Sequence, residues 1–287
     1  PAEVEMDGTT INNAGGGVIS CQGASMEITN LAISNGSNYQ YSYEYLLEYS
    51  DGTTSTYSST STSPSIGLSA ADCSTYVDGA VFSDLDGNAI ELVSYSSSTS
   101  STELNDVTIT SVGNESLYSD SAIYGYSYGG DMSIYADGLA IRDANNGHGI
   151  EVYGSSGATV LFAGTDVSVN GAIGNGLYAY ASAGTDSVTV DVDGLDIQNV
   201  GSDGIYAYQS TITVTNSSVS SNTGSGMLVS KATTTVTDSL FESNGSYGME
   251  CDGGTEACSG VTHLTNGDGE QSGCDATCGE DEATIPE

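Results

Sequence analysis

Seven tyrosines recur at matching positions in four similar segments of the sequence, AIYGYS, GIEVYG, GLYAYA and GIYAYQ. If each segment is a strand, its second residue points inward and its third and fifth residues point outward, because side chains alternate along a strand. The inward residues are then Ile123, Ile150, Leu177 and Ile205. One predicted outward row holds Tyr126, Tyr153, Tyr180 and Tyr208, and a partial row beside it holds Tyr124, Tyr178 and Tyr206. Such rows can stack sugars or pack against a partner; the alternative is that tyrosine simply favours strands.

A second group of tyrosines interrupts the pattern near the N-terminus. Tyr39, Tyr41, Tyr43 and Tyr45 alternate with other residues, which places all four on one face of a strand. Asp51-Gly52 follows and is a hairpin turn signal. Residues 38–65 are therefore predicted to form a tyrosine-faced β-hairpin that is inserted into the rest of the fold and adds to the contact surface.

Two acidic segments, DLDGNAIE and DVDGLD, have oxygen ligands two residues apart around a glycine, as calcium sites do. The candidate ligands are Asp84, Asp86, Asn88 and Glu91 in the first segment, and Asp191, Asp193 and Asp196 in the second. Neither segment is a complete calcium loop, and the same residue types are ordinary turn formers. Calcium is therefore a candidate cofactor, and plain turns are the alternative.

The six cysteines predict disulfides and an oxidising compartment. They are Cys21, Cys73, Cys251, Cys258, Cys274 and Cys278. Zinc is the rival interpretation for the last four, but no histidine has a suitable spacing among them. The simplest pairing joins Cys21 to Cys73 and places two further bonds within residues 251–278.

The charge is strongly acidic, with 38 Asp and Glu against two basic residues, Arg142 and Lys231, and a net charge of −36. Nucleic acid and anionic membranes are excluded as partners, because both require clustered lysine and arginine. No apolar run reaches 18 residues, so no membrane insertion is expected. The chain starts at Pro1 without a leader pattern, as a mature secreted protein would. The charge favours either cation binding or solubility in a salty extracellular medium.

A repeat in the sequence predicts the strands that position these residues. GIYAYQSTITVTNSSVSSNTGS and GMLVSKATTTVTDSLFESNGSY are copies of one unit, and Gly204, Gly226 and Gly248 are 22 residues apart. Apolar and polar residues alternate within each unit, as short strands require. A unit this short cannot bury its own apolar side, so it must stack on its neighbours. The repeat therefore predicts a β-solenoid.

The same frame extends along most of the chain. The predicted inward anchors of the coils are Ile11, Ile33, Phe82, Ile109, Ile141, Val169, Ile197, Val219 and Phe241. The 49-residue gap after Ile33 fits one insertion, or a missed coil plus an insertion. Two residues after each anchor stands a predicted bend residue: Asn13, Asn35, Asp84, Ser111, Asp143, Gly171, Asn199, Ser221 and Ser243. Residues 1–250 are thus predicted to form roughly nine or ten coils, and residues 251–287 a Cys-rich cap or assembly contact that has lost the period.

This pattern resembles the right-handed parallel β-helix, or pectate-lyase-like, superfamily, and the expected fold is all-β. Lyases of that superfamily use an Arg or Lys base beside calcium, but Arg142 and Lys231 lie four coils apart by this alignment, roughly 19 Å. Gly147-His148-Gly149 matches one motif of its polygalacturonase-like hydrolases, whose Asp-Asp, Asn-Thr-Asp and Arg-Ile-Lys motifs are absent. His148 is therefore predicted to be a turn residue, and the chain a secreted non-enzymatic member.

Three functions remain open at this point. The first is a self-assembling extracellular fibre or surface-layer subunit, because coil stacks expose unpaired strand edges and no covering helix is visible near Pro1. Copies of the chain, joined end to end, would then be the partner. The second is a glycan-binding adhesin that uses the tyrosine rows. The third is a divergent polysaccharide-degrading enzyme.

Overall fold

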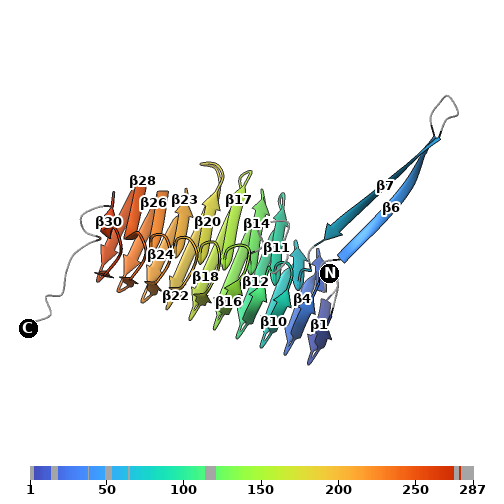
Figure 1. Ribbon diagram of the computed structural model, residues 1–287, viewed down its shortest axis with the longest axis horizontal. Coiled ribbons are helices and arrows are strands. Elements are labelled where there is room, and N and C mark those ends of the chain that lie inside the picture. The colour runs from blue at the N-terminus through green and yellow to red at the C-terminus, as the bar shows by residue number, and fades with distance from the viewer. Residues whose placement is uncertain are drawn as a thin grey trace, which may run out of the picture.

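The structure is a computed structural model that describes residues 3–13, 19–37, 39–48, 54–63, 65–113, 121–274 and 278. Nearly every coil contributes three short strands, and each strand pairs in parallel with the equivalent strand one coil further on. Figure 1 shows the coils stacked along one axis, with the colour running from the N-terminal to the C-terminal end. Within the described residues, no helix is long and apolar enough to cross a membrane.

The strands form three parallel stacks and one hairpin. The first stack contains β3 (Ile19–Gln22), β8 (Leu68–Ala71), β11 (Ile90–Tyr95), β14 (Ile123–Tyr128), β17 (Ile150–Ser155), β20 (Leu177–Ala181), β23 (Ile205–Tyr208) and β30 (Gly269–Ser272). The second contains β1 (Glu3–Asp7), β4 (Ser25–Thr29), β9 (Ser74–Asp78), β12 (Thr99–Asn105), β15 (Asp131–Asp137), β18 (Thr159–Thr165), β21 (Ser187–Asp193) and β24 (Thr211–Thr215). β26 (Met227–Thr237) and β28 (Tyr247–Ser259) run through both stacks and join them into one 18-stranded sheet.

The third stack is a separate ten-stranded sheet, and it carries the predicted anchors. Its strands are β2 (Thr10–Asn12), β5 (Ala32–Gly36), β10 (Val81–Leu85), β13 (Thr108–Val112), β16 (Ala140–Ala144), β19 (Ser168–Asn170), β22 (Asp196–Gln198), β25 (Ser218–Ser220), β27 (Leu240–Glu242) and β29 (Thr262–Leu264). All nine anchors lie opposite one another in consecutive strands, from Ile11 to Phe241. The ten strands confirm the predicted number of coils, and their apolar residues form one continuous core.

The bends are where the sequence places them. All nine predicted bend residues have a positive φ, for example 58° at Asn199 and 85° at Gly171. Glycine, asparagine and aspartate tolerate this left-handed conformation best, and it turns the chain near the end of the third strand of each coil. A second set of left-handed residues, including Gly194 and Asn216, turns the chain between the second and third strands. That second set of bends was not predicted from the sequence.

The repeated glycines are required by close packing. A Cβ atom on Gly226 would lie 2.7 Å from both the carbonyl oxygen of Gly248 and the Cδ1 atom of Phe241. These distances are shorter than van der Waals contact, so a side chain at this point would push successive coils apart. The 22-residue spacing of the glycines therefore marks a place in each coil that leaves no room for a side chain.

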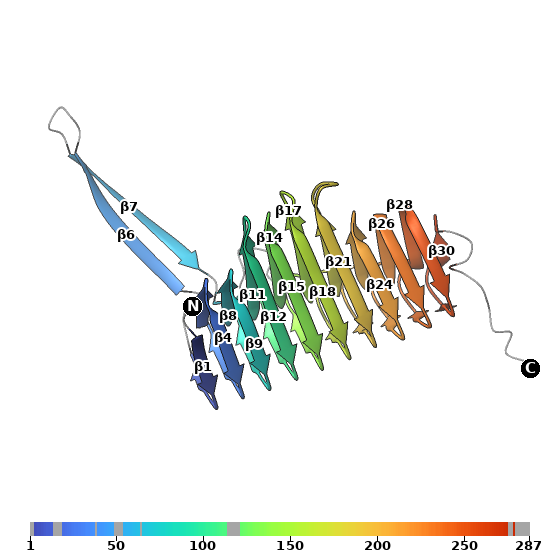
Figure 2. The same ribbon diagram turned by 180° about the vertical axis from the view of Figure 1, so that it is seen from behind.

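The insertion after the second coil is a hairpin, as predicted. β6 (Tyr39–Glu48) and β7 (Thr54–Ser63) pair in antiparallel fashion and project from the N-terminal part of the stack (Figures 1 and 2). Ile33 and Phe82 are direct register partners, so the 49-residue gap holds no missed coil. The predicted Asp51-Gly52 turn, and the side chains of Tyr39, Tyr41, Tyr43 and Tyr45, lie outside the described residues.

The coils continue beyond the predicted boundary at residue 250. β28, β29 and β30 extend the stacks to Ser272, and His263 takes the anchor position opposite Phe241. The predicted boundary at residue 250 was wrong because the next coil has His263 at the anchor position instead of an apolar residue. The glycines and acidic residues around His263 also hide the apolar repeat. His263 is nonetheless buried.

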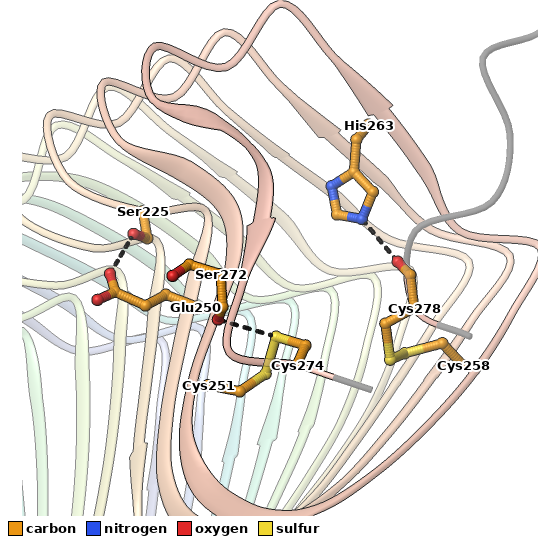
Figure 3. Close-up of a disulfide and its surroundings, with 8 residues drawn as sticks. All are labelled: Ser225, Glu250, Cys251, Cys258, His263, Ser272, Cys274 and Cys278. Carbon is orange, nitrogen blue, oxygen red and sulfur yellow. Dashed lines mark hydrogen bonds between the residues drawn. A yellow bond between two sulfur atoms is a disulfide. The ribbon is translucent and has the colours of Figure 1, made fainter. Parts of the chain in front are cut away.

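Disulfides hold the segment that follows against the last coil. Cys251 bonds to Cys274 and Cys258 to Cys278, and the Nε2 atom of His263 lies 2.9 Å from the carbonyl oxygen of Cys278 (Figure 3). The third bond joins Cys21 to Cys73. The predicted disulfide framework is thereby confirmed, and three such bonds are typical of an oxidising compartment.

Candidate functional site

The predicted tyrosine rows lie on the outer face of four consecutive strands of the first stack, β14, β17, β20 and β23. One row places Tyr126, Tyr153, Tyr180 and Tyr208 in direct register, and the other places Tyr124, Glu151, Tyr178 and Tyr206 in register. The four inward residues that set this orientation, from Ile123 to Ile205, are fully buried. These eight outward residues, seven tyrosines and one glutamate, are called the tyrosine platform below.

The rings of the platform stack on one another along the helix axis. Ring centres are 5.2 Å apart for Tyr126 and Tyr153, 5.2 Å for Tyr153 and Tyr180, and 4.9 Å for Tyr180 and Tyr208. In the second row, Tyr178 and Tyr206 are 5.0 Å apart. Tyr180 therefore has a stacked ring over each face, whereas Tyr153 has Tyr180 stacked on one face and the Tyr126 ring tilted by 35° beside the other. A sugar cannot stack on those faces, so the platform presents ring edges and hydroxyl groups to a ligand, which differs from the sugar stacking expected from the sequence.

His148 adds a ring to the second row. It lies in the turn before β17, as predicted, and its imidazole stacks on Tyr178 with ring centres 4.6 Å apart. The main-chain N–H of Asn175 donates to its Nδ1 atom at 2.9 Å. Burial lowers the pKa of His148 to about 4, so the ring is neutral near pH 7. The sequence showed only a glycine-flanked turn residue; the available signal was its place two residues before Ile150.

Glu151 occupies the one position of the platform that is not a tyrosine. It is register partner to both Tyr124 and Tyr178, and it accepts a hydrogen bond of 2.7 Å from the Ser121 hydroxyl. Burial raises the pKa of the Glu151 carboxyl. Burial, then Tyr206 and Glu151, raise the pKa of Tyr178 to about 12. The Tyr178 hydroxyl thus remains protonated near pH 7 and able to donate a hydrogen bond.

Replacing Glu151 with glutamine should raise the melting temperature at pH 7. The folded-state pKa of Glu151 is raised, so its favourable contribution to stability is present below its unfolded pKa of about 4.3 and is lost as the pH rises through the folded value. Glutamine removes the buried charge and keeps an acceptor for Ser121. The gain over wild type, measured by thermal melts from pH 3 to pH 8, should vanish below about pH 4. The control is the exposed Glu103→Gln change, which removes a solvated carboxylate and should not raise the melting temperature at pH 7.

The fold separates the predicted ligands of the second calcium segment. Asp191 and Asp193 are exposed on β21 and line a shallow hollow of about 500 Å³ with Tyr135 and Ala163, whereas Asp196 lies on β22 in the third stack. Asp84, Asp86 and Asn88 follow the chain from the end of β10 into the turn before β11. Among the described residues, no three His, Cys, Asp or Glu side chains are grouped to hold a metal ion. Calcium binding stays a prediction.

The two basic residues do not converge. Arg142 is exposed on β16, and its register partners run through Asn170, Gln198 and Ser220 to Glu242, four coils on. Lys231 lies in that later coil, on β26. Its Nζ atom is 5.3 Å from the ring centre of Tyr208 and donates a 3.4 Å hydrogen bond to the Tyr208 hydroxyl. A single cation therefore stands at the C-terminal end of the tyrosine platform.

One family model agrees with the fold. The family model described as "Right handed beta helix region" matches residues 175–258. Among solved structures, a double mutant of the periplasmic alginate epimerase AlgG has a TM-score of 0.37 and 11% identity, and the likeness covers 95% of this chain and 72% of that one. AlgG itself has a TM-score of 0.31 and 9% identity, covering 88% of this chain and 76% of that one. No curated protein matches. The chain is a right-handed parallel β-helix, as the sequence predicted.

Proposed function

We propose that the chain binds a polysaccharide through the tyrosine platform, and that this role is binding rather than catalysis. One observation carries the proposal. Seven tyrosines and one glutamate occupy the eight outward positions on four consecutive strands. Tyrosine offers a large amphipathic contact with few rotatable bonds. Because stacking already fixes the rings, binding costs little further side-chain entropy.

The geometry suits a polymer that lies along the helix axis. Equivalent hydroxyls recur once per coil, about 4.8 Å apart, so a chain of sugars can repeat similar contacts on successive strands. An aromatic patch bordered by polar residues is typical of binding surfaces. The three disulfides agree with a location outside the cytoplasm, and a secreted or cell-surface adhesin is the role we propose.

Replacing Tyr180 with alanine should weaken polysaccharide binding by about thirtyfold or more, the effect of a central contact residue. Tyr180 lies between Tyr153 and Tyr208 in the first row and beside Tyr178. Affinity electrophoresis through gels that contain soluble neutral or acidic polysaccharides measures the effect. Tyr135→Ala is the matched control, because Tyr135 is an exposed tyrosine on β15 of the second stack. Wild-type protein that no polysaccharide retards, or equal losses in both variants, would contradict the proposal.

Self-association is the second candidate function, and the N-terminal end of the stack favours it. Met6, Ile11 and Ile19 line an apolar hollow of about 330 Å³ there. The opposite end differs, because disulfides hold Cys274 and Cys278 against the last coil. A contact between two N-terminal ends would produce a closed dimer rather than the head-to-tail fibre expected from the sequence.

An Ile11→Asp change should abolish that association, because it places a charge in the apolar contact. Light scattering coupled to size-exclusion chromatography, across salt and calcium concentrations, measures the mass. Asn12→Asp is the control, since Asn12 is exposed on the same strand. A wild-type protein that stays monomeric at high concentration under every condition would remove this candidate and leave polysaccharide binding unaffected.

A further inference from the structure

A further row of side chains runs along the helix axis beside the two rows of the tyrosine platform. Its members stand two residues before the strands β17, β20, β23 and β26. It comprises His148, Asn175, Asp203 and Ser225. The main-chain N–H of Asn175 donates to Nδ1 of His148 at 2.9 Å, that of Asp203 to Oδ1 of Asn175 at 3.0 Å, and that of Ser225 to Oδ1 of Asp203 at 2.8 Å. Each side chain thus accepts a hydrogen bond from the next coil. This flanking row is fixed by the stack and borders the platform from β17 to β23.

The hydrogen bond from Asn175 determines which ring nitrogen of His148 carries the proton that a ligand can accept. Because Nδ1 accepts a hydrogen bond, the neutral ring carries its proton on Nε2. Stacking on Tyr178 fixes the plane of the ring, with 15° between the two planes. Within the described part of the chain, no hydrogen bond to Nε2 is seen, and the side chain is only partly buried. His148 therefore presents an oriented N–H donor at the border of the platform.

Carboxylates supply the acceptors on the same border. Glu151 lies within the platform, and Asp203 in the flanking row keeps its second carboxylate oxygen after accepting from Ser225. Glu250 extends the platform's second row beyond Leu228 and accepts a 3.0 Å hydrogen bond from the Ser225 hydroxyl. Among the described residues, the one cation beside the platform is Lys231, which contacts Tyr208 at the far end. An anionic ligand laid along the platform would meet repulsion at several coils.

We propose that the platform selects uncharged, hydroxyl-rich glycans, with His148 as the specificity-determining donor and Glu151 and Asp203 as acceptors. This inference rests on the proposed function and names the ligand class of the same surface. Nε2–H of His148 donates to a sugar hydroxyl, and the two carboxylates accept from others. The carboxylates also exclude uronate-containing and sulfated chains, because acidic sugars laid along the platform would face like charges, with a counter-ion only at the Lys231 end.

The test compares a neutral probe, soluble mixed-linkage β-glucan or galactomannan, with polygalacturonate in affinity electrophoresis at low and high salt. Wild type should be retarded by at least one neutral glycan and not by polygalacturonate. His148→Asn should weaken neutral binding by about three- to tenfold. It should keep the axial hydrogen bond, since Asn175 shows that asparagine can accept it, and lower the melting temperature only by the loss of the stacking on Tyr178. A Glu151→Gln, Asp203→Asn double variant should gain measurable binding to polygalacturonate.

The outcomes separate this inference from the function on which it rests. Wild-type binding to polygalacturonate that is as strong as neutral binding, and is lost in Tyr180→Ala, would overturn the selectivity and leave the platform as the binding surface. Neutral binding that His148→Asn does not change would overturn the role of His148. Absence of binding to every glycan would remove the proposed function, and this inference with it.

Discussion

Replacing Val214 with aspartate should unfold the coils around β24. Val214 is fully buried, and its register partners Val192 and Val236 are buried valines. The new carboxylate would have no partner in an apolar core, and such burial costs at least about 4 kcal/mol. Because each coil stacks on the next, the loss should spread to neighbouring coils. Far-ultraviolet circular dichroism and thermal melts should show lost β structure or a much lower melting temperature.

Thr235→Asp is the matched control for this change. Thr235 is exposed on β26, the neighbouring strand, and its register partners Thr213 and Ala257 carry no charge. The same aspartate should therefore be tolerated there, with a change of less than about 0.5 kcal/mol. Equal effects at both positions would mean that the assignment of inward and outward residues is wrong.

Replacing Asn244 with alanine should lower the free energy of unfolding by about 2–4 kcal/mol. Asn244 is 1% exposed and belongs to a ladder with Asn222 and Asn266. Its Oδ1 accepts from the main-chain and side-chain nitrogens of Asn222, and its Nδ2 donates to the Val219 carbonyl. Alanine would leave these buried groups without partners, and chemical denaturation measures the loss.

Thr223→Ala provides the comparison for the asparagine ladder. Thr223 is exposed and follows Asn222 directly in the same turn. Its loss removes a side chain of similar size from solvent, so the free energy of unfolding should change by less than about 0.5 kcal/mol. If the two variants were equally stable, the buried ladder would contribute little to holding the last coils together.

Much of the architecture could be predicted because a β-solenoid repeats its requirements. Each coil must place an apolar anchor inward and a left-handed residue at the same bend, so Ile197 and Asn199 have counterparts in every predicted coil. The prediction failed at His263, where a polar residue is buried at an anchor position. It also missed the asparagine ladder, because the sequence does not show whether a turn asparagine points inward or outward.

The tyrosine platform, too, could be predicted only in part from the sequence. The sequence by itself determined which tyrosines share a face, since Tyr126 and Tyr153 follow from alternation along a strand and from the coil period. Only the tertiary structure decided how their rings lie, because each ring orientation depends on a neighbour in the next coil. The stack of His148 on Tyr178, and the hydrogen bond that fixes its free N–H, likewise join residues of different coils. The alternation of inward and outward side chains can be read from the sequence, whereas contacts between coils form only when the coils stack.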